Sequence, residues 1–396
     1  MKGRSAVRMM IYSQDGFGLG HLRRNLNIAI QVQRQVPRAV ILIVADSPAA
    51  PFFRLPPRCD FVKIPTLVKV NTGVWSSDRL QLVNEELLSI RSEIMENVAT
   101  GFRPNLVLVD HMPNGVSGEL ARPLQALRAR APRAQIVLGL RDILGARADI
   151  RRQWQADGAF EATERYYDRI LVYGCADMFD LATEYQFPPR LAAKTVYCGY
   201  VSREHIGPRA PAPEAPPPRA RRRVPFVLVT GGGGADASFF MDRFLDALRV
   251  LGTGMPCRAV LALGPFLHQQ QYRLLAKKAR GLAVRLSRLD QDSIRLLRRA
   301  DLVISMAGYN TVCEIMRFRK KAIVIPRPGP SAEQTMRTKI MASRGLFHAI
   351  HPHYLTPESL AAAIAERIAA PGDMNEGNLP PLDGASRAAA CMLTEV

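Results

Sequence analysis

Small polar and acidic residues follow two apolar runs in the stretch SMAGYNTVCEIMRFRKKAIVIPRPGPSAEQTMRTK, residues 305–339. One group stands between an apolar run and a helical pattern, and a second group opens the next helical pattern. Ligands of parallel sheets bind beyond the carboxyl ends of the strands. The stretch therefore predicts a ligand site built from two consecutive strand-to-helix turns. Its candidate residues are Gly308, Tyr309, Asn310, Thr311, Glu314, Glu333, Gln334 and Arg337.

Glycine-rich turns precede two other predicted helices. VTGGGGADASFF (229–240) has four glycines after an apolar run, and such a turn exposes backbone N–H groups that suit a phosphate. No Lys-Ser/Thr pair follows, so it is not the P-loop of an ATPase. QDGFGLGH (14–21) has G-x-G-x-G spacing, which does not match the dinucleotide fingerprint. The candidate phosphate-binding glycines are Gly18, Gly20, Gly232, Gly233 and Gly234.

Titratable side chains follow other apolar runs. His21 opens a long helical pattern, where an imidazole can be a general base, bind a phosphate or simply cap the turn. Asp110 ends the run LVLVD, where it can be a base or a helix cap. We take His21 and Asp110 as the catalytic candidates. Four further residues at strand ends are candidates for binding an acceptor, the second substrate of a group-transfer reaction: His111, Asn114, Arg141 and Asp142.

The sequence predicts no metal ion. DQD (290–292) looks like the D-x-D of some metal-dependent sugar transferases, but Asp292 is well placed to cap the following helix. HPH (351–353) lacks a third ligand. The six cysteines form no C-x-x-C pair and several lie in apolar runs, which indicates buried thiols rather than a zinc site or a disulfide framework.

The chain is strongly basic, with a formal net charge of +19 over 396 residues. Its basic clusters, RARRR, RLLRR and RFRKK, contain no interleaved aromatic residues of the kind that stack on bases. We therefore expect no nucleic-acid partner, and favour peripheral contact with an anionic membrane surface; an arginine-rich genome is the alternative explanation. No apolar run is long enough to span a membrane and no signal-peptide pattern is present, so a cytoplasmic location is expected.

Strand and helix patterns alternate along the chain, which predicts two doubly wound α/β domains with parallel sheets. The first set of strands is VRMMIYS, AVILIVA, LVLVD, QIVLGL and RILVYG, and helices lie between them at about 21–36, 79–99, 118–130 and 147–167. The second set is FVLVT, CRAVLAL, LAVRLS, LVISM and AIVIP. The predicted organisation is a Rossmann-like domain over 1–205, a Pro/Arg-rich linker over 206–223, a second Rossmann-like domain over 224–383 and a closing helix over 384–396.

The stretch SMAGYNTVCEIMRFRKKAIVIPRPGPSAEQ resembles the nucleotide-binding signature of MurG-type glycosyltransferases of family 28. That family typically has S-x-A-G-x-x-T-x-x-E, then a strand ending in proline and a loop with glutamine. GFGLGH and VTGGGGAD resemble its two glycine loops. The resemblance implies the GT-B architecture, in which two Rossmann-like domains face each other across a cleft. The first domain would bind the acceptor and the second the nucleotide-sugar donor.

By this resemblance, Glu314 would accept hydrogen bonds from both ribose hydroxyls of a uridine nucleotide, since a carboxylate can take two donors. Gly308 and Thr311 would contact the diphosphate, and the second glycine loop would contact it from the other side. His21 would face the anomeric carbon. The remaining implied contacts are Leu289 and Asp290 beside the base and Gln334 with the donor sugar.

Some positions depart from the family pattern. Gly233 and Gly234 stand where the family often has Ser-Gln, so the phosphate contacts there would come from the backbone alone. Glu333 replaces a frequent glutamine and Arg337 a frequent asparagine. These changes leave the identity of the sugar open. The nearest equivalent of a lipid-facing loop is TLVKVNTGVW (66–75), with Lys63, Lys69 and Trp75 as interface anchors.

The resemblance implies an inverting, metal-independent transferase that moves a sugar from a nucleotide-diphosphate donor, expected to be UDP-linked, to a hydroxyl acceptor. The nucleotide sugar is a substrate, so no cofactor is expected. The acceptor would be lipid-linked or a cell-envelope glycan, which suits a protein on the inner face of the plasma membrane. Two alternatives stay open: a nucleotide-sugar 2-epimerase of the same fold, and a non-catalytic subunit that binds nucleotide sugar or membrane.

Overall fold

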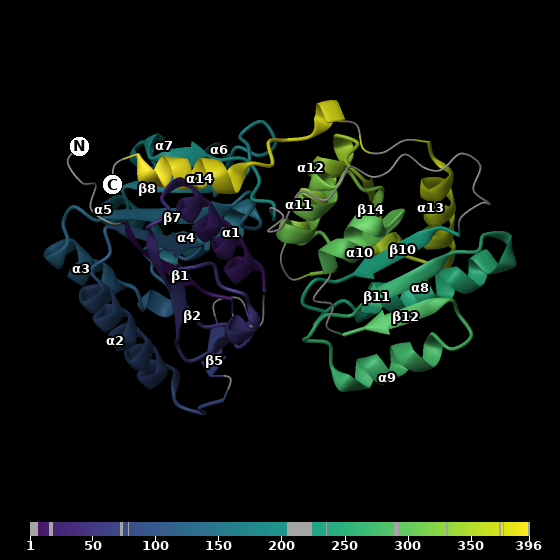
Figure 1. Ribbon diagram of the computed structural model, residues 1–396, viewed down its shortest axis with the longest axis horizontal. Coiled ribbons are helices and arrows are strands. Elements are labelled where there is room, and N and C mark those ends of the chain that lie inside the picture. The colour runs from purple at the N-terminus through teal and green to yellow at the C-terminus, as the bar shows by residue number, and fades with distance from the viewer. Residues whose placement is uncertain are drawn as a thin grey trace. The chain divides into compact units, whose positions relative to one another are not determined.

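The chain folds into two compact units (Figure 1). Unit 1 comprises Met1–Ser202 together with Pro380–Val396, and unit 2 comprises Arg203–Leu379. The predicted linker, 206–223, lies outside the residues that the structure describes. The computed structural model describes residues 7–15, 19–71, 74–77, 79–203, 224–234, 236–288, 293–329, 332–371, 374 and 376–394.

Unit 1 is built on a seven-stranded parallel sheet with the order β3-β2-β1-β6-β7-β8-β9. Every residue of β6 is buried, as expected for a strand covered on both faces. The sequence predicted five of these strands; β3 and β9 were missed. The strands are β1 (Arg8–Ser13), β2 (Val40–Ala45), β3 (Cys59–Lys63), β6 (Leu106–Asp110), β7 (Gln135–Arg141), β8 (Arg169–Tyr173) and β9 (Thr195–Tyr197).

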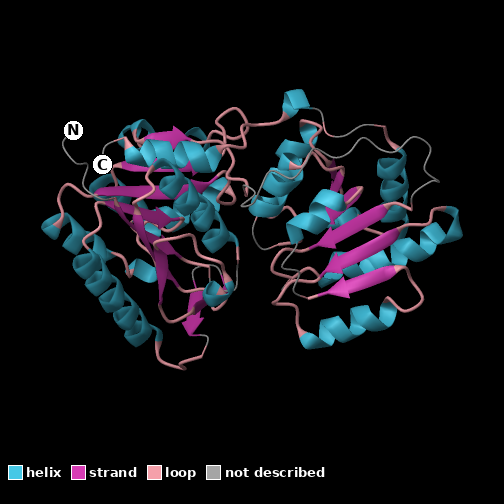
Figure 2. Cartoon of the chain, viewed as in Figure 1, coloured by secondary structure: helices cyan, strands magenta, loops and turns pink. Residues whose placement is uncertain are grey.

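Helices flank this sheet (Figure 2). The single helix predicted over 147–167 is wrong, because Gly158 has a left-handed backbone with φ 60° and separates two helices. A hairpin of β4 (Leu67–Asn71) and β5 (Val74–Ser77) stands apart from the main sheet. The helices are α1 (Gly20–Gln35), α2 (Asn84–Phe102), α3 (Ala121–Arg130), α4 (Arg147–Ala156), α5 (Ala159–Tyr166), α6 (Leu181–Glu184), α7 (Pro189–Ala193) and α14 (Gly384–Leu393), with short 3-10 turns at Ala50–Phe52 and Val116–Gly118.

Unit 2 has a six-stranded parallel sheet with the order β12-β11-β10-β13-β14-β15. Apolar side chains of α8, α9 and α13 pack with the sheet into one core. The strands are β10 (Phe226–Thr230), β11 (Arg258–Ala262), β12 (Val284–Ser287), β13 (Leu302–Ser305), β14 (Ala322–Val324) and β15 (His348–Ala349). The helices are α8 (Ser238–Leu251), α9 (Gln269–Lys278), α10 (Ser293–Arg299), α11 (Tyr309–Arg317), α12 (Glu333–Ser343) and α13 (Pro357–Ala369), with 3-10 turns at Gly252–Gly254, Pro352–Tyr354 and Glu376–Asn378.

The chain returns from unit 2 to unit 1 through Pro380, and α14 packs on α1 (Figure 1). Backbone hydrogen bonds join the two crossing segments: Tyr200 N–H donates to Pro381 and Gly384 N–H donates to Tyr200. The Ser202 hydroxyl also donates to the Leu382 carbonyl, 2.8 Å away. The closing helix is therefore an integral part of the first unit.

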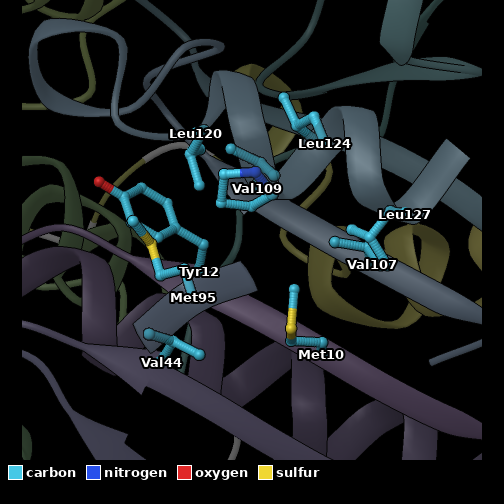
Figure 3. Close-up of a pocket in the computed structure, with 10 residues that line it drawn as sticks. Met10, Tyr12, Val44, Met95, Val107, Val109, Leu120, Leu124 and Leu127 are labelled. Atoms are coloured by element: carbon cyan, nitrogen blue, oxygen red, sulfur yellow. The ribbon is translucent and has the colours of Figure 1, made fainter. Parts of the chain in front are cut away.

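The core of unit 1 contains a small apolar cavity (Figure 3). Side chains of β1, β2 and β6 on one side and of α2 and α3 on the other line it, among them Met10, Val44 and Met95. It encloses about 10 Å³. A water molecule needs about that volume and several polar partners as well. We therefore interpret this cavity as imperfect packing and not as a ligand site.

Each sheet has one point where the strand order reverses. In unit 1 it lies between β1 and β6, and in unit 2 it lies between β10 and β13. Connections from the two strands diverge there and leave a crevice at the carboxyl ends, which is the usual ligand site of doubly wound folds. The glycine turns follow β1 and β10, and His21, Asp110 and the 308–314 group lie at the ends of β1, β6 and β13; Arg141 and Asp142 lie at the end of β7, and Glu333, Gln334 and Arg337 come after β14.

Candidate active site

His21 and Asp110 meet at the reversal point of unit 1. His21 lies in the first turn of α1 and Asp110 is the last residue of β6, and Nδ1 of the imidazole is 2.7 Å from Asp110 Oδ2. The carboxylate oxygen can only accept, so Nδ1 carries the proton in this pair. Nε2 then holds the lone pair. The arrangement is that of an imidazole base oriented by a carboxylate.

Asp110 is completely buried, whereas 18% of the His21 side chain is exposed. Burial alone would raise the pKa of Asp110, but the charges and hydrogen bonds of Arg24 and His21 outweigh it and hold that pKa well below its usual range. Arg24 donates to both carboxylate oxygens, and Asn25 donates to Oδ2 at 3.2 Å. Of the two catalytic candidates, only His21 is exposed, and Asp110 is its buried partner.

His111 lies beside this pair. Its ring centroid is 5.2 Å from that of His21, and its backbone has an unusual positive φ of 74°. Burial and the nearby charge of Arg141 hold the pKa of His111 well below its usual value, so the ring is neutral.

The remaining acceptor-side candidates have mainly structural surroundings. The Asn114 amide donates to the Asp157 carbonyl, 2.6 Å away, at the turn between α4 and α5. Asp142 is buried and packs closely against Gly174: a Cβ added at Gly174 would lie 2.8 Å from the Cβ of Asp142. Arg141 ends β7 and is half-buried. Among these four, His111 is the one whose ring is shown in contact with His21.

The N-terminus of α1 is capped by a carboxylate from the preceding loop. Asp15 accepts hydrogen bonds from the backbone N–H of His21 at 2.9 Å and of Leu22 at 2.5 Å. Gly20 is the first residue of this helix, and Gly18 lies outside the described residues. Two of the N–H groups that a phosphate at this turn would need are therefore already bonded to the carboxylate of Asp15.

The glycine turn of unit 2 follows β10. Gly234 has φ 89°, and a Cβ there would lie 1.8 Å from the Leu263 carbonyl oxygen, so packing against the end of β11 requires this glycine. Gly232 also has a positive φ, 67°, but it is exposed and faces open space. Gly233 accepts a hydrogen bond from Phe266 N–H at 3.0 Å. A Cβ at Gly231 would lie 2.1 Å from the Cβ of Ala237, so packing explains two glycines of the run, and Gly232 is the one that leaves room for a ligand.

Gly308 precedes α11 at the end of β13. Its φ of −64° is ordinary, and a Cβ there would meet nothing within 4 Å. Among the described residues neither backbone strain nor packing requires this glycine, an ordinary N-cap residue, and it leaves the backbone open to close approach. Asn310 and Thr311 in the first turn are half-buried, and Glu314, 6% exposed, follows on the same helical face. The N-cap residues of α8, α11 and α12 are Ala237, Gly308 and Ala332, whose own side chains make no capping hydrogen bond.

Arg337 braces this turn from α12. It is 1% exposed, donates to the Ala307 carbonyl at 2.9 Å and pairs with Glu333 at 2.9 Å. Its guanidinium carbon lies 5.7 Å from the centroid of the buried Tyr309 ring. We interpret Arg337 and Glu333 as positioning residues for the turn after β13.

An ion pair joins the two loops on either side of β13. Asp236, in the loop after β10, pairs with Arg327, which follows β14, and both side chains are more than one-third exposed. Arg327 N–H also donates to the Gln334 side-chain oxygen at 3.0 Å. The pair joins the loops that follow the two strands flanking β13, the strand that leads to α11.

Several predicted features remain outside the described residues, namely Leu289, Asp290 and the DQD segment. Over the residues that are described, no group of three His, Cys, Asp or Glu side chains is arranged to hold a metal ion. The sequence analysis missed Arg24, Asp15, Asp236 and Arg327. Only Arg24 had a usable signal, since it lies one helical turn after His21.

No described helix is long and apolar enough to cross a membrane. Two of the predicted interface anchors make contacts within unit 1. Trp75 packs on the buried cluster of Leu67, Leu87 and Val116. The Lys63 ammonium donates to Ile64 and Thr66. Lys69 lies in β4, in the hairpin. The exposed apolar side chains of unit 1 include instead Phe52 (89%), Leu80 (55%) and Val83 (70%).

Residues 226–377 match the model of the glycosyltransferase family 28 C-terminal domain. The matched residues lie within unit 2. The MurG-like character inferred from the sequence is thereby confirmed. One similar protein is the UDP-N-acetylglucosamine–N-acetylmuramyl-(pentapeptide) pyrophosphoryl-undecaprenol N-acetylglucosamine transferase of Mesorhizobium japonicum, 30% identical over 185 residues, which are 45% of this chain and 48% of that protein. The chain thus spans about half the length of the curated relatives it matches.

Solved structures extend the likeness of the fold beyond the family 28 domain. The MurG of Acinetobacter baumannii has a TM-score of 0.56 and 17% identity, with 97% of this chain and 95% of that one covered. A glycosyltransferase of kitacinnamycin has a TM-score of 0.63 and 14% identity, with 99% and 100% covered. At such identities the likeness shows the fold, and it confirms the predicted GT-B fold class.

Proposed function

We propose that this chain is an inverting glycosyltransferase that moves a sugar from a nucleotide-diphosphate donor, a UDP-sugar, to a hydroxyl acceptor. The observation that carries the proposal is the contact of His21 Nδ1 with Asp110 at 2.7 Å, since it leaves Nε2 as a base at the reversal point of unit 1. The family 28 domain in unit 2 supports a nucleotide-sugar donor.

The reaction would be a single displacement. The acceptor oxygen forms a bond to the anomeric carbon while the bond from that carbon to the donor diphosphate breaks, and UDP leaves with the electron pair. His21 Nε2 takes the acceptor proton, and the ionised Asp110 stabilises the resulting imidazolium through Nδ1–H. Attack opposite the leaving group inverts the anomeric configuration.

The turns of unit 2 suit the donor. Backbone N–H groups at the start of α11, beside Gly308, and at the glycine turn before α8 would stabilise the negative diphosphate. Glu314 would accept from the ribose hydroxyls. Helix N-termini and the nearby Arg327 supply positive charge, so the departure of UDP needs no metal ion. We place Gln334 near the donor sugar.

Exposed apolar side chains of unit 1 and the charge of the chain support a proposal for the acceptor and for the location of the protein. We propose a hydroxyl of a lipid-linked or cell-envelope glycan, reached from the inner face of the plasma membrane. Phe52, Leu80 and Val83 are exposed apolar side chains that suit an interface, and the net charge of +19 suits anionic headgroups.

A thermal-shift panel of nucleotide sugars, with and without EDTA, tests the donor. A ligand at one hundred times its dissociation constant adds about 2.7 kcal/mol of stability. We expect UDP-linked sugars to raise the unfolding temperature and EDTA to leave that rise unchanged. Loss of the rise in EDTA, restored by magnesium, would contradict metal independence.

A second assay separates transfer from the alternatives. We expect UDP release that depends on an added hydroxyl acceptor and gives a product of inverted configuration. A 2-epimerised sugar, or a glycal formed without acceptor, would identify an epimerase of this fold. Tight UDP binding without turnover on any acceptor, together with binding to anionic vesicles, would identify a non-catalytic subunit.

A further inference from the structure

The cap of α1 comes from outside the helix. The helix N-cap residue, Leu19, offers no side-chain acceptor, and the carboxylate of Asp15 takes that place. One oxygen accepts from His21 N–H and the other from Leu22 N–H, at 2.9 and 2.5 Å. The residue that bears the proposed base is therefore held at its backbone by Asp15 and at its ring by Asp110.

Asp15 is itself anchored to a second helix. Its backbone N–H donates to Asp46 Oδ1 at 2.8 Å, and the completely buried Asp46 follows the end of β2. Arg91 of α2 lies 3.8 Å from the other Asp46 oxygen. Glu119 fixes Arg91 through contacts of 2.5 and 2.7 Å. A continuous set of polar contacts thus runs from α2 through Asp46 and Asp15 to the first turn of α1.

The ionised form of Asp15 is costly to the fold. Burial raises its pKa to about 6 and the Asp46 charge adds to the rise, although His21 and the two backbone hydrogen bonds lower it. A carboxyl whose folded pKa lies above its unfolded value of about 3.9 destabilises the fold at every pH at which it is ionised. The opposite holds for Asp180, the cap of α6, because hydrogen bonds from Tyr197 and Thr183 lower its pKa.

We infer that Asp15 is a positioning residue for His21: it fixes the first turn of α1 and fills the anion position there, so that this turn orients the base and does not bind the donor diphosphate. The inference rests on the proposed role of His21 as the base. It assigns the first turn of α1 to hold the base and the glycine turn of unit 2 to hold the phosphates.

The substitution Asp15→Asn tests this, with Asp180→Asn as the matched control. Asn can accept only one of the two backbone hydrogen bonds. We expect the turnover of D15N to fall by roughly 10- to 100-fold, as for a small misplacement of a catalytic group. Its affinity for UDP should be unchanged. At a pH above the pKa of Asp15, its unfolding temperature should equal or exceed that of the parent protein. D180N should lose stability and keep its turnover.

Hydrogen exchange of the segment 19–26 provides a readout that needs no activity. We expect faster exchange there in D15N than in the parent, with or without UDP. Unchanged exchange would overturn the inference, as would weaker UDP binding by D15N, because that would make the turn a phosphate site. A parent protein without turnover would instead contradict the proposed transferase, and the exchange result would still decide the role of Asp15.

Discussion

Arg24 donates from one nitrogen to both carboxylate oxygens of Asp110, at 2.7 and 2.9 Å. The same nitrogen lies 2.8 Å from His21 Nδ1. Since Nδ1 needs its proton for Asp110, this third contact is a close approach of two donors and not a hydrogen bond. Arg24 therefore contacts both members of the pair, and its charge keeps Asp110 ionised beside the imidazole.

Replacing Arg24 by Met should destabilise unit 1, because removing one partner of a buried ion pair costs about 3–5 kcal/mol. It should also shift acid unfolding. The folded pKa of Asp110 lies below its unfolded pKa, so Asp110 stabilises the fold at any pH above the unfolded pKa. This stability is lost as the pH falls from the unfolded pKa towards the folded pKa. Loss of Arg24 raises the folded pKa of Asp110, so unfolding should begin at a higher pH. Circular dichroism against pH measures this, and R24K, which keeps the charge, should lie between R24M and the parent.

Replacing His21 by Ala should lower turnover by roughly 100- to 10,000-fold, the usual worth of a general base. UDP affinity should change little, since the donor is assigned to unit 2. H21Q retains a hydrogen-bonding group that does not titrate, so it should not restore turnover. Recovery of activity in H21Q, or weaker donor binding in H21A, would indicate a phosphate ligand and not a base.

Replacing Glu314 by Ala should weaken UDP binding by about 1.5–3 kcal/mol, the range for hydrogen bonds to a charged group. E314Q should lose less, because the amide oxygen still accepts one bond. Isothermal titration with UDP measures both. Uridine diphosphate and its 2′-deoxy analogue should bind equally to E314A, and a preserved difference between them would move the ribose contact elsewhere.

Replacing Gly308 by Ala should separate binding from stability. A Cβ at this position meets nothing within 4 Å and φ is −64°, so the unfolding temperature should change little. UDP affinity should fall clearly if the diphosphate approaches this backbone as closely as we propose. Gly101, whose Cβ would also meet nothing, lies in α2 and provides the control. Equal UDP binding by G308A and the parent would place the diphosphate away from α11.

Asp236 and Arg327 should have opposite effects on the donor. In the free protein the carboxylate of Asp236 holds the Arg327 cation that a diphosphate would attract. D236N should therefore tighten UDP binding, while R327Q should weaken it, and both effects should shrink at high salt. The pair is largely exposed, so its own contribution to stability is small. If both variants weaken binding alike, the pair acts only to hold the loops.

The sequence predicted the strands best where burial on both faces leaves a continuous apolar run, as in β6 and β13. It missed β3, an edge strand whose residues Cys59–Lys63 are only half-buried or exposed, and β15, which has two residues. The approach of His21 to Asp110 was predictable because both follow strands that meet at the reversal point. The Asp15 cap was not, since it joins a carboxylate to backbone N–H groups across a loop, and side-chain types do not encode such a contact.

The helix α14 has a consequence for the order in which the chain is made. Its buried residues, among them Ala388 and Met392, pack in unit 1, yet they follow all of unit 2 in the sequence. On the ribosome, the face of α1 that α14 covers must stay open until the whole of unit 2 has been synthesised. Unit 2 is one uninterrupted segment and can fold as soon as it has been made. Unit 1 lacks α14 until the end of synthesis, so the face of α1 that α14 covers is exposed until then. The first unit is thus complete only when the last residues of α14 have been made.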